Sequence, residues 1–101
     1  MAGKSGLNLT KDEPLPEFLS HYHPQAAQLN AAVSGFGPQE VITWAEGLGQ
    51  KVCTGSTGRV FPVAMKASPL LRTWLARLAG LGVRLISRWR WTGWDGEAAV
   101  F

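Results

Sequence analysis

The sequence is poor in cysteine and in long apolar runs. Cys53 is the only cysteine among 101 residues, so no disulfide can form within the chain. No apolar run approaches the length that spans a bilayer, and the first residues carry Lys4 without the apolar block of a secretory signal. We therefore expect a single cytoplasmic domain that makes no contact with a membrane.

Acidic residues are scarce in the second half of the chain. Residues 1–50 hold two Lys/Arg against five Asp/Glu, whereas residues 51–101 hold eight against two. Three of the five tryptophans fall between positions 89 and 94, and large aromatic rings usually lie against a core, a partner or a ligand. The basic half is compatible with a nucleic-acid face, a phosphate-bearing ligand or an acidic partner surface, and composition does not choose among them.

Near the start, Gly3-Lys4-Ser5 has the form of the end of a phosphate-binding loop. The earlier glycine of such a loop would lie before Met1, and no helix follows the Lys-Ser pair, because the next residues are turn formers with prolines close behind. The sequence therefore does not predict a P-loop. It predicts a glycine-rich, cationic loop whose backbone can approach a phosphate or a ring.

The first half of the chain carries three helical patterns. Two short helices are expected over Pro16–His23 and Gln25–Val33, separated at Pro24. A third begins at Pro38, has Glu40 at its positive end, and stops among Gly47 and Gly49. Its apolar residues repeat at helical spacing, which predicts one buried face made of Val41, Ile42, Ala45 and Leu48.

The second half changes to short apolar runs around turns. Val52-Cys53 and Val60-Phe61 flank a glycine-rich turn and predict a hairpin. Ser68 is expected to cap a helix that ends at Gly80 and Gly82, with a core-facing stripe of Leu71, Trp74, Leu75 and Leu78. Residues 83–91 alternate and predict a strand with one basic side, residues 92–96 predict a turn, and residues 97–101 predict the start of another strand.

These elements predict an α/β domain with an α+β-like arrangement of helices and short hairpins. Its apolar helix face needs a sheet that these residues barely supply, so we expect one partial domain, an interior slice of a larger protein. Its parts are a glycine-rich loop at 1–13, a helical segment at 14–50, a hairpin at 51–63, and a helix, strand and turn at 68–101.

Three stretches together resemble a known family. The loop "AGKSGLNLT", the segment "GSTGRVFPVAMKASPLLRTWLARLAGLGV" and the strand and turn "RWRWTGW" are similar to the BaiN-like NAD(P)/FAD-dependent oxidoreductases, and more narrowly to their uncharacterised flavoprotein subgroup. The resemblance implies part of a Rossmann-type FAD-binding domain, with FAD as cofactor, NAD(P)H as electron donor and hydride transfer through the flavin. The family opens with a strand, a GxGxxG turn and a helix. This sequence lacks that opening, since Gly35-Phe36-Gly37 has no third glycine and follows no predicted strand.

The resemblance also implies the site residues. Arg90 and Trp91 fall where a strand of related flavoproteins reaches the adenine end of FAD, and Arg59 and Lys66 are placed to help shape the site. No residue is identified as a catalytic acid or base. Without the GxGxxG turn, we expect the chain alone to be inactive, to bind FAD weakly or not at all, and to have the remainder of the flavoprotein as its partner. The residues implied to contact the flavin are Gly3, Lys4, Ser5, Gly6, Asn8 and Thr10.

Three other patterns have competing interpretations. His21-x-His23 has no third ligand at sensible spacing, so two surface histidines are favoured over a metal site, and no metal is expected. Cys53 is interpreted as a small buried hydrophobe and not as a nucleophile. The Arg/Trp stretch at 84–94 is the alternative functional site, a small module that binds single-stranded nucleic acid or protein. A strand with a packed aromatic face is favoured over it, and on sequence alone Arg59 and Lys66 are solvated charges.

Overall fold

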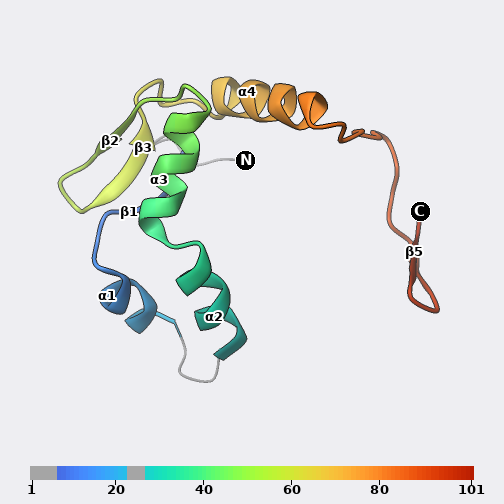
Figure 1. Cartoon of the computed structure of the whole chain (residues 1–101), viewed down its shortest axis with the longest axis horizontal. Helices are drawn as coiled ribbons and strands as arrows, with labels where there is room; N and C mark the ends of the chain where they lie inside the picture. The colour runs from blue at the N-terminus through green and yellow to red at the C-terminus, as the bar shows by residue number, and fades with distance from the viewer. Residues whose placement is uncertain (1–6, 23–26) are drawn as a thin grey trace.

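The computed structural model describes residues 7–22 and 27–101, and the expected α/β class is confirmed (Figure 1). A small three-stranded sheet lies beside the helices of the first half of the chain. A long helix leads from this body to a separate two-stranded hairpin. Within the described ranges, no helix is long and apolar enough to cross a membrane. The elements are β1 Thr10–Lys11, α1 Leu15–Ser20, α2 Ala27–Gly35, α3 Pro38–Gly47, β2 Val52–Thr54, β3 Arg59–Pro62, α4 Ala67–Gly80, β4 Gly93–Asp95 and β5 Ala98–Val100.

The predicted hairpin is β2 and β3, which pair antiparallel with Cys53 opposite Phe61. Its turn closes through a 2.8 Å hydrogen bond from the Gly55 N–H to the Arg59 carbonyl, and Gly58 supplies the left-handed backbone, at φ 81°. Strand β1 adds to the free edge of β3, with Thr10 opposite Val60, so the strand order is β1-β3-β2. The sequence analysis predicts only a loop at residues 1–13. Strand β1 forms because it pairs with β3, and two residues are too few to show an alternating pattern.

Helix α3 has the predicted bounds and ends. Pro38 occupies its first turn, Glu40 lies at its positive end, and Gly49 adopts φ 79° just past the C-cap. The N–H of Gln50 donates to the Ala45 carbonyl at 3.0 Å, which closes a Schellman motif. The two preceding helices are also confirmed with shifted ends, because α1 stops at Ser20 and α2 begins at Ala27.

The core lies where the end of α3 meets the beginning of α4 and the sheet. Ala45, Leu48 and Leu70 form its buried cluster, and Leu7, Leu9, Trp44 and Val52 pack against it. Val60 and Pro62 of β3 are fully buried as well. Only one face of the sheet is covered in this way. Cys53 is therefore exposed, which contradicts the prediction that it is buried.

Helix α4 begins at Ala67, two residues before the start that the expected Ser68 cap predicts. Its N-cap is Lys66, with extended backbone and no side-chain hydrogen bond, so the predicted Ser68 cap is wrong. Its apolar stripe is only partly buried: Leu70 is 6% exposed, whereas Leu71 and Trp74 are 48% and 42% exposed. The prediction of a fully core-facing stripe is wrong at these two positions, because the described residues place no second layer over this side of the helix.

The predicted strand at 83–91 is absent. Residues 83–92 form neither helix nor strand, and residues 81–92 are exposed throughout. The chain then forms a hairpin of β4 and β5, with Gly96 at φ 60° in its turn. The predicted turn at 92–96 is thus largely strand β4, and the strand expected from Glu97 is confirmed as β5. We name residues 83–101 the C-terminal arm.

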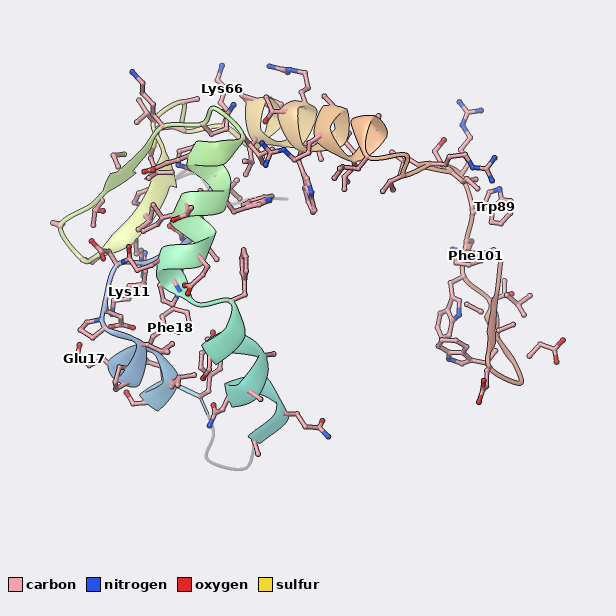
Figure 2. All side chains as sticks on the ribbon, viewed as in Figure 1. Lys11, Glu17, Phe18, Lys66, Trp89 and Phe101 are labelled. Atoms are coloured by element: carbon pink, nitrogen blue, oxygen red, sulfur yellow. The ribbon has the colours of Figure 1, made fainter. Side chains whose placement is uncertain are left out.

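The arm makes the molecule open in shape. The Cα radius of gyration is 16.6 Å, whereas a compact domain of this length has about 13 Å. Figure 1 shows the arm beyond the far end of α4, away from the sheet. Its rings contact each other, with Trp89 and Phe101 at 5.6 Å between centroids and Trp91 and Trp94 at 6.1 Å. The predicted packed aromatic face therefore has partners within the arm and not in the core (Figure 2).

Candidate functional site

An apolar groove runs over the joint between α3 and α4. Its volume is about 310 Å³, which is at the small end of the range for ligand pockets. Every lining residue is apolar or aromatic. The groove is defined by Leu7, Leu9, Trp44, Ala67, Leu70, Leu71 and Trp74.

Two tryptophans from different helices form one side of the groove. Trp44 of α3 and Trp74 of α4 meet edge to face, with ring centroids 5.4 Å apart and planes at 90°. The helices are held in this relation by Arg77, whose guanidinium donates a 2.6 Å hydrogen bond to the Gly47 carbonyl at the end of α3. The groove therefore offers a fixed aromatic corner, with Trp74 still 42% exposed, to a flat apolar ring.

Two described residues of the predicted flavin loop line this groove. Gly3, Lys4, Ser5 and Gly6 lie outside the described residues. Leu7 and Leu9 line the groove, Asn8 between them is exposed, and Thr10 is half-buried in β1. The Leu9 N–H donates to the Val60 carbonyl at 2.9 Å, which fixes the end of the loop to the sheet.

The remaining predicted residues do not join this group. Arg90 and Trp91 are exposed on the C-terminal arm, which Figure 1 shows remote from β1. Arg59 of β3 stands opposite Lys11 of β1 and is exposed, and Lys66 projects from the start of α4 (Figure 2). Sequence reasoning missed Leu7, Leu9, Trp44 and Trp74 as lining residues. Helical spacing assigned Trp74 to a core, and no sequence pattern shows that Leu7, Leu9 and Trp44 lie beside an open side of it.

A second cavity, of about 400 Å³, has charged side chains in its lining beside apolar ones. We name it the acidic hollow. Glu40 reaches back over the helix start: its Oε2 is 3.4 Å from the place that a Cβ on Gly37 would occupy. Three carboxylates line the hollow, and their negative charge offsets the attraction that the N-terminus of α3 would have for an anionic ligand. It is lined by Asp12, Glu13, Pro14, Leu15, Gly37, Pro38, Gln39 and Glu40.

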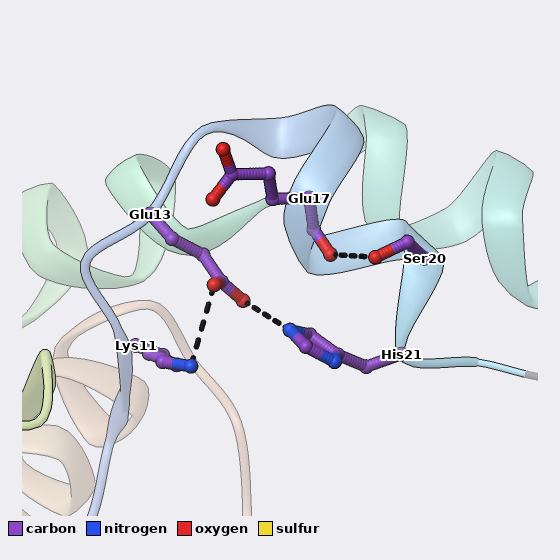
Figure 3. A network of polar contacts seen from close by, with 5 residues as sticks. All are labelled: Lys11, Glu13, Glu17, Ser20 and His21. Atoms are coloured by element: carbon purple, nitrogen blue, oxygen red, sulfur yellow. Dashed lines mark hydrogen bonds and ion pairs between the residues drawn. The ribbon is translucent and has the colours of Figure 1, made fainter.

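The carboxylates beside this hollow are held by an ion-pair network (Figure 3). The Glu13 side chain is 10% exposed and lies between Lys11, at 3.4 Å from Nζ to Oε2, and His21, at 3.2 Å from Nε2 to Oε1. The Gln39 amide donates to the Asp12 carboxylate at 3.0 Å. These contacts tie α1 and α3 to β1, so the network is structural.

No metal centre forms in the part of the chain that the structure describes, where no three histidine, cysteine or acidic side chains come together. His21 is exposed and pairs with Glu13. His23 lies outside the described residues. The Gly35-Phe36-Gly37 stretch joins α2 to α3, so it follows a helix and not a strand, and it makes no dinucleotide-binding turn.

Comparison with known proteins gives one finding on the whole chain. Residues 1–101 match the family model described as the HI0933-like protein Rossmann domain. No curated protein matches the chain at a significant level.

Proposed function

Since this chain belongs to the HI0933-like family of FAD-binding oxidoreductases, which it matches over residues 1–101, we propose that it supplies one wall of the flavin pocket. The observation that carries the proposal is the apolar groove, which Leu7 and Leu9 of the glycine-rich loop help to line. When bound, FAD supplies hydride transfer through its isoalloxazine ring, and the protein supplies binding, orientation and electrostatics. The finer assignment is to the BaiN-like subgroup, with NAD(P)H as electron donor.

The groove suits the ring part of the cofactor. Leu7, Leu9 and Leu71 offer aliphatic surface, and the exposed side of Trp74 offers a stacking partner for a flat heterocycle. Burial of the ring here would also keep water from its reactive face. Asn8 is exposed between the two leucines, and we propose that its amide donates to or accepts from the polar edge of the ring.

The loop before Leu7 suits the anionic part of the cofactor. Gly3 and Gly6 allow close backbone approach, and Lys4 brings a positive charge, so we propose that Gly3, Lys4, Ser5, Gly6, Asn8 and Thr10 contact the flavin or its phosphates. The acidic hollow is the wrong site for a pyrophosphate. Arg90 and Trp91 at the adenine end remain a prediction, because they lie on the arm and not beside the groove.

We further propose that the chain forms only part of this site. Its sequence has no GxGxxG turn after a strand, and the N-terminus of the helix after such a turn is the main pyrophosphate site in Rossmann domains. The 101-residue chain alone should then bind FAD weakly, with a dissociation constant on the order of 1 mM. This corresponds to a binding free energy of about −4 kcal/mol. Stoichiometric FAD that co-purifies with the chain would contradict this.

The test is flavin titration with matched tryptophan variants. Stacking on an indole quenches flavin fluorescence. We therefore expect the quenching of FMN fluorescence by the chain to fall at least threefold in Trp74→Ala. Trp94→Ala is the matched control, since Trp94 is exposed on the arm, and it should leave the quenching unchanged. Equal quenching by both variants and the original chain would show that the groove is not the flavin site.

One observation favours a second function. Trp89, Trp91 and Trp94 are 61%, 53% and 68% exposed among the arginines of the arm, which is the combination that single-strand nucleic-acid binders use. The arm as a small nucleic-acid or protein-binding module is therefore the alternative. It ranks second, because the rings already pack on one another and the family match points to a flavoprotein.

A further inference from the structure

A pocket on helix α3 combines aromatic rings with one carboxylate. Its volume is about 410 Å³, and it is lined by Phe36, Gln39, Glu40, Thr43 and Trp44. The four lining residues that belong to α3 recur at three- and four-residue spacing, so they share one face of the helix. Phe36 is 54% exposed, and Glu40 is exposed as well. We name this site the α3 pocket.

The α3 pocket is negatively charged. Among the described residues, the Glu40 carboxylate has no ion-pair partner. The acidic hollow adjoins the pocket, because both are lined by Gln39 and Glu40. It adds the carboxylate of Asp12, which receives a hydrogen bond from the neutral Gln39 amide. An arginine guanidinium suits such a pocket, because it pairs with a carboxylate and stacks on aromatic rings.

The C-terminal arm carries groups that match this pocket. Arg88 and Arg90 are exposed, and neither forms an ion pair with another described residue. They alternate with Trp89 and Trp91, which are 61% and 53% exposed. No acidic residue lies between positions 83 and 94, so the positive charge of this stretch is not balanced within it.

The arm is directed away from the α3 pocket of its own chain. Helix α4 has 14 residues and is therefore about 21 Å long, and the arm continues beyond its far end (Figure 1). A Schellman motif fixes the exit from α4, since Gly82 has φ 84° and the Val83 N–H donates to the Leu78 carbonyl at 2.9 Å. A second copy of the chain presents the same arm without this constraint.

We infer that Arg88 and Arg90 of one copy bind the α3 pocket of a second copy, so that two chains exchange arms in a homodimer. The acidic first half of the chain carries the pocket and the basic second half carries the arm, so charge complementarity identifies the chain itself as the partner. Reciprocal exchange gives a closed twofold dimer. Exposed ion pairs contribute little each, so we expect a weak dimer, with a dissociation constant between about 10 μM and 1 mM.

Sedimentation equilibrium of the full chain tests this inference. The chain should show a monomer–dimer equilibrium over about 10 μM to 1 mM, and salt raised from about 0.05 M to 0.5 M should weaken the dimer. Glu40→Arg should raise the dissociation constant about tenfold or more, because like charges then meet. Glu46→Arg is the matched control, since Glu46 is an exposed glutamate of α3 outside the pocket, and it should leave the dissociation constant unchanged.

A charge swap separates a direct contact from a loss of folding. Arg88→Glu combined with Arg90→Glu should also abolish the dimer. An equimolar mixture of this chain with Glu40→Arg should restore it, because each pocket then meets an arm of opposite charge. Far-UV circular dichroism checks that both variants fold, and Glu40→Gln, which keeps the side-chain shape, takes the place of an unfolded Glu40→Arg and should weaken the dimer.

Several results would overturn the inference. These are a monomer at about 1 mM and low salt, equal effects of Glu40→Arg and Glu46→Arg, and no rescue in a mixture of folded variants. Contact between the arm and the pocket that is independent of chain concentration would also overturn it, because the arm would then bind its own chain. No flavin is present in these experiments, so their failure is distinguishable from failure at the apolar groove.

Discussion

Arg77 in α4 donates a 2.6 Å hydrogen bond to the carbonyl of Gly47, the last residue of α3. A cation at the C-terminus of a helix interacts favourably with the helix dipole and with carbonyls that lack an intrahelical partner. This contact, the Trp44–Trp74 pair and the buried cluster of Ala45, Leu48 and Leu70 join the two helices around the apolar groove. Changes at the joint should therefore affect stability and the groove together.

Arg77→Ala should lower the free energy of unfolding by about 0.5–1.5 kcal/mol, the range for a charge-assisted hydrogen bond at a helix end. Urea denaturation followed by far-UV circular dichroism measures it. Arg72→Ala, an exposed arginine on the same helix, is the control and should change stability by less than about 0.5 kcal/mol. An equal loss of unfolding free energy in both variants would mean that the contact with Gly47 does not stabilise the fold.

The two neighbouring leucines at the start of α4 should separate stability from binding. Leu70 is 6% exposed, and Leu70→Ala should cost about 2–4 kcal/mol through the lost contacts and the cavity left behind. Leu71 is 48% exposed, so Leu71→Ala should cost less than about 1 kcal/mol but should reduce FMN quenching. Denaturation and flavin titration on both variants check this. A fully stable Leu70→Ala would contradict the described core.

Glu13 should hold α1 to the sheet. Its carboxylate is 10% exposed and contacts Lys11 and His21, so Glu13→Gln should destabilise the chain by up to about 1 kcal/mol, because Lys11 loses its ion-pair partner. Glu17→Gln, an exposed carboxylate on α1, should have little effect. The readout is thermal unfolding at low and at moderate salt. Moderate salt should reduce the difference in melting temperature between Glu13→Gln and the original chain. If salt leaves that difference unchanged, the effect is not electrostatic.

The alternative function makes a clear prediction. If the arm bound single-stranded nucleic acid, oligo(dT) would quench tryptophan fluorescence, and the affinity would fall steeply with salt. We expect no saturable quenching at about 0.15 M salt, the physiological range. Saturable, salt-dependent binding that is lost in Trp89→Ala and Trp91→Ala together would establish the nucleic-acid module in place of the flavin pocket.

Elements with local signals were predictable from the sequence. Helix α3 has a proline at its start, a glycine past its end and a helical stripe between them, and the β2–β3 hairpin has a glycine-rich turn between two apolar runs. Each of these depends on residues within a few positions of one another. The predictions for both elements are confirmed, with β2 and β3 each slightly longer than the runs that indicated them.

Elements that depend on a neighbour were not predictable. Strand β1 exists because the edge of β3 is free, and no pattern at Thr10–Lys11 shows this. Residues 83–91 have the alternation of a strand but no neighbouring backbone among the described residues, so the predicted strand does not form. The same limit applies to the groove: the spacing of Leu71 and Trp74 predicts burial, and only the structure shows them open.

The most direct test of the flavin-wall proposal uses the five tryptophan indoles as separate reporters. In ¹H–¹⁵N spectra of the labelled chain titrated with FMN, the indole N–H signals of Trp44 and Trp74 should shift saturably with the Leu7 and Leu9 amides, while those of Trp89, Trp91 and Trp94 stay in place. Shifts confined to the three arm indoles, or no saturable shift at Trp44 and Trp74, would contradict the proposal.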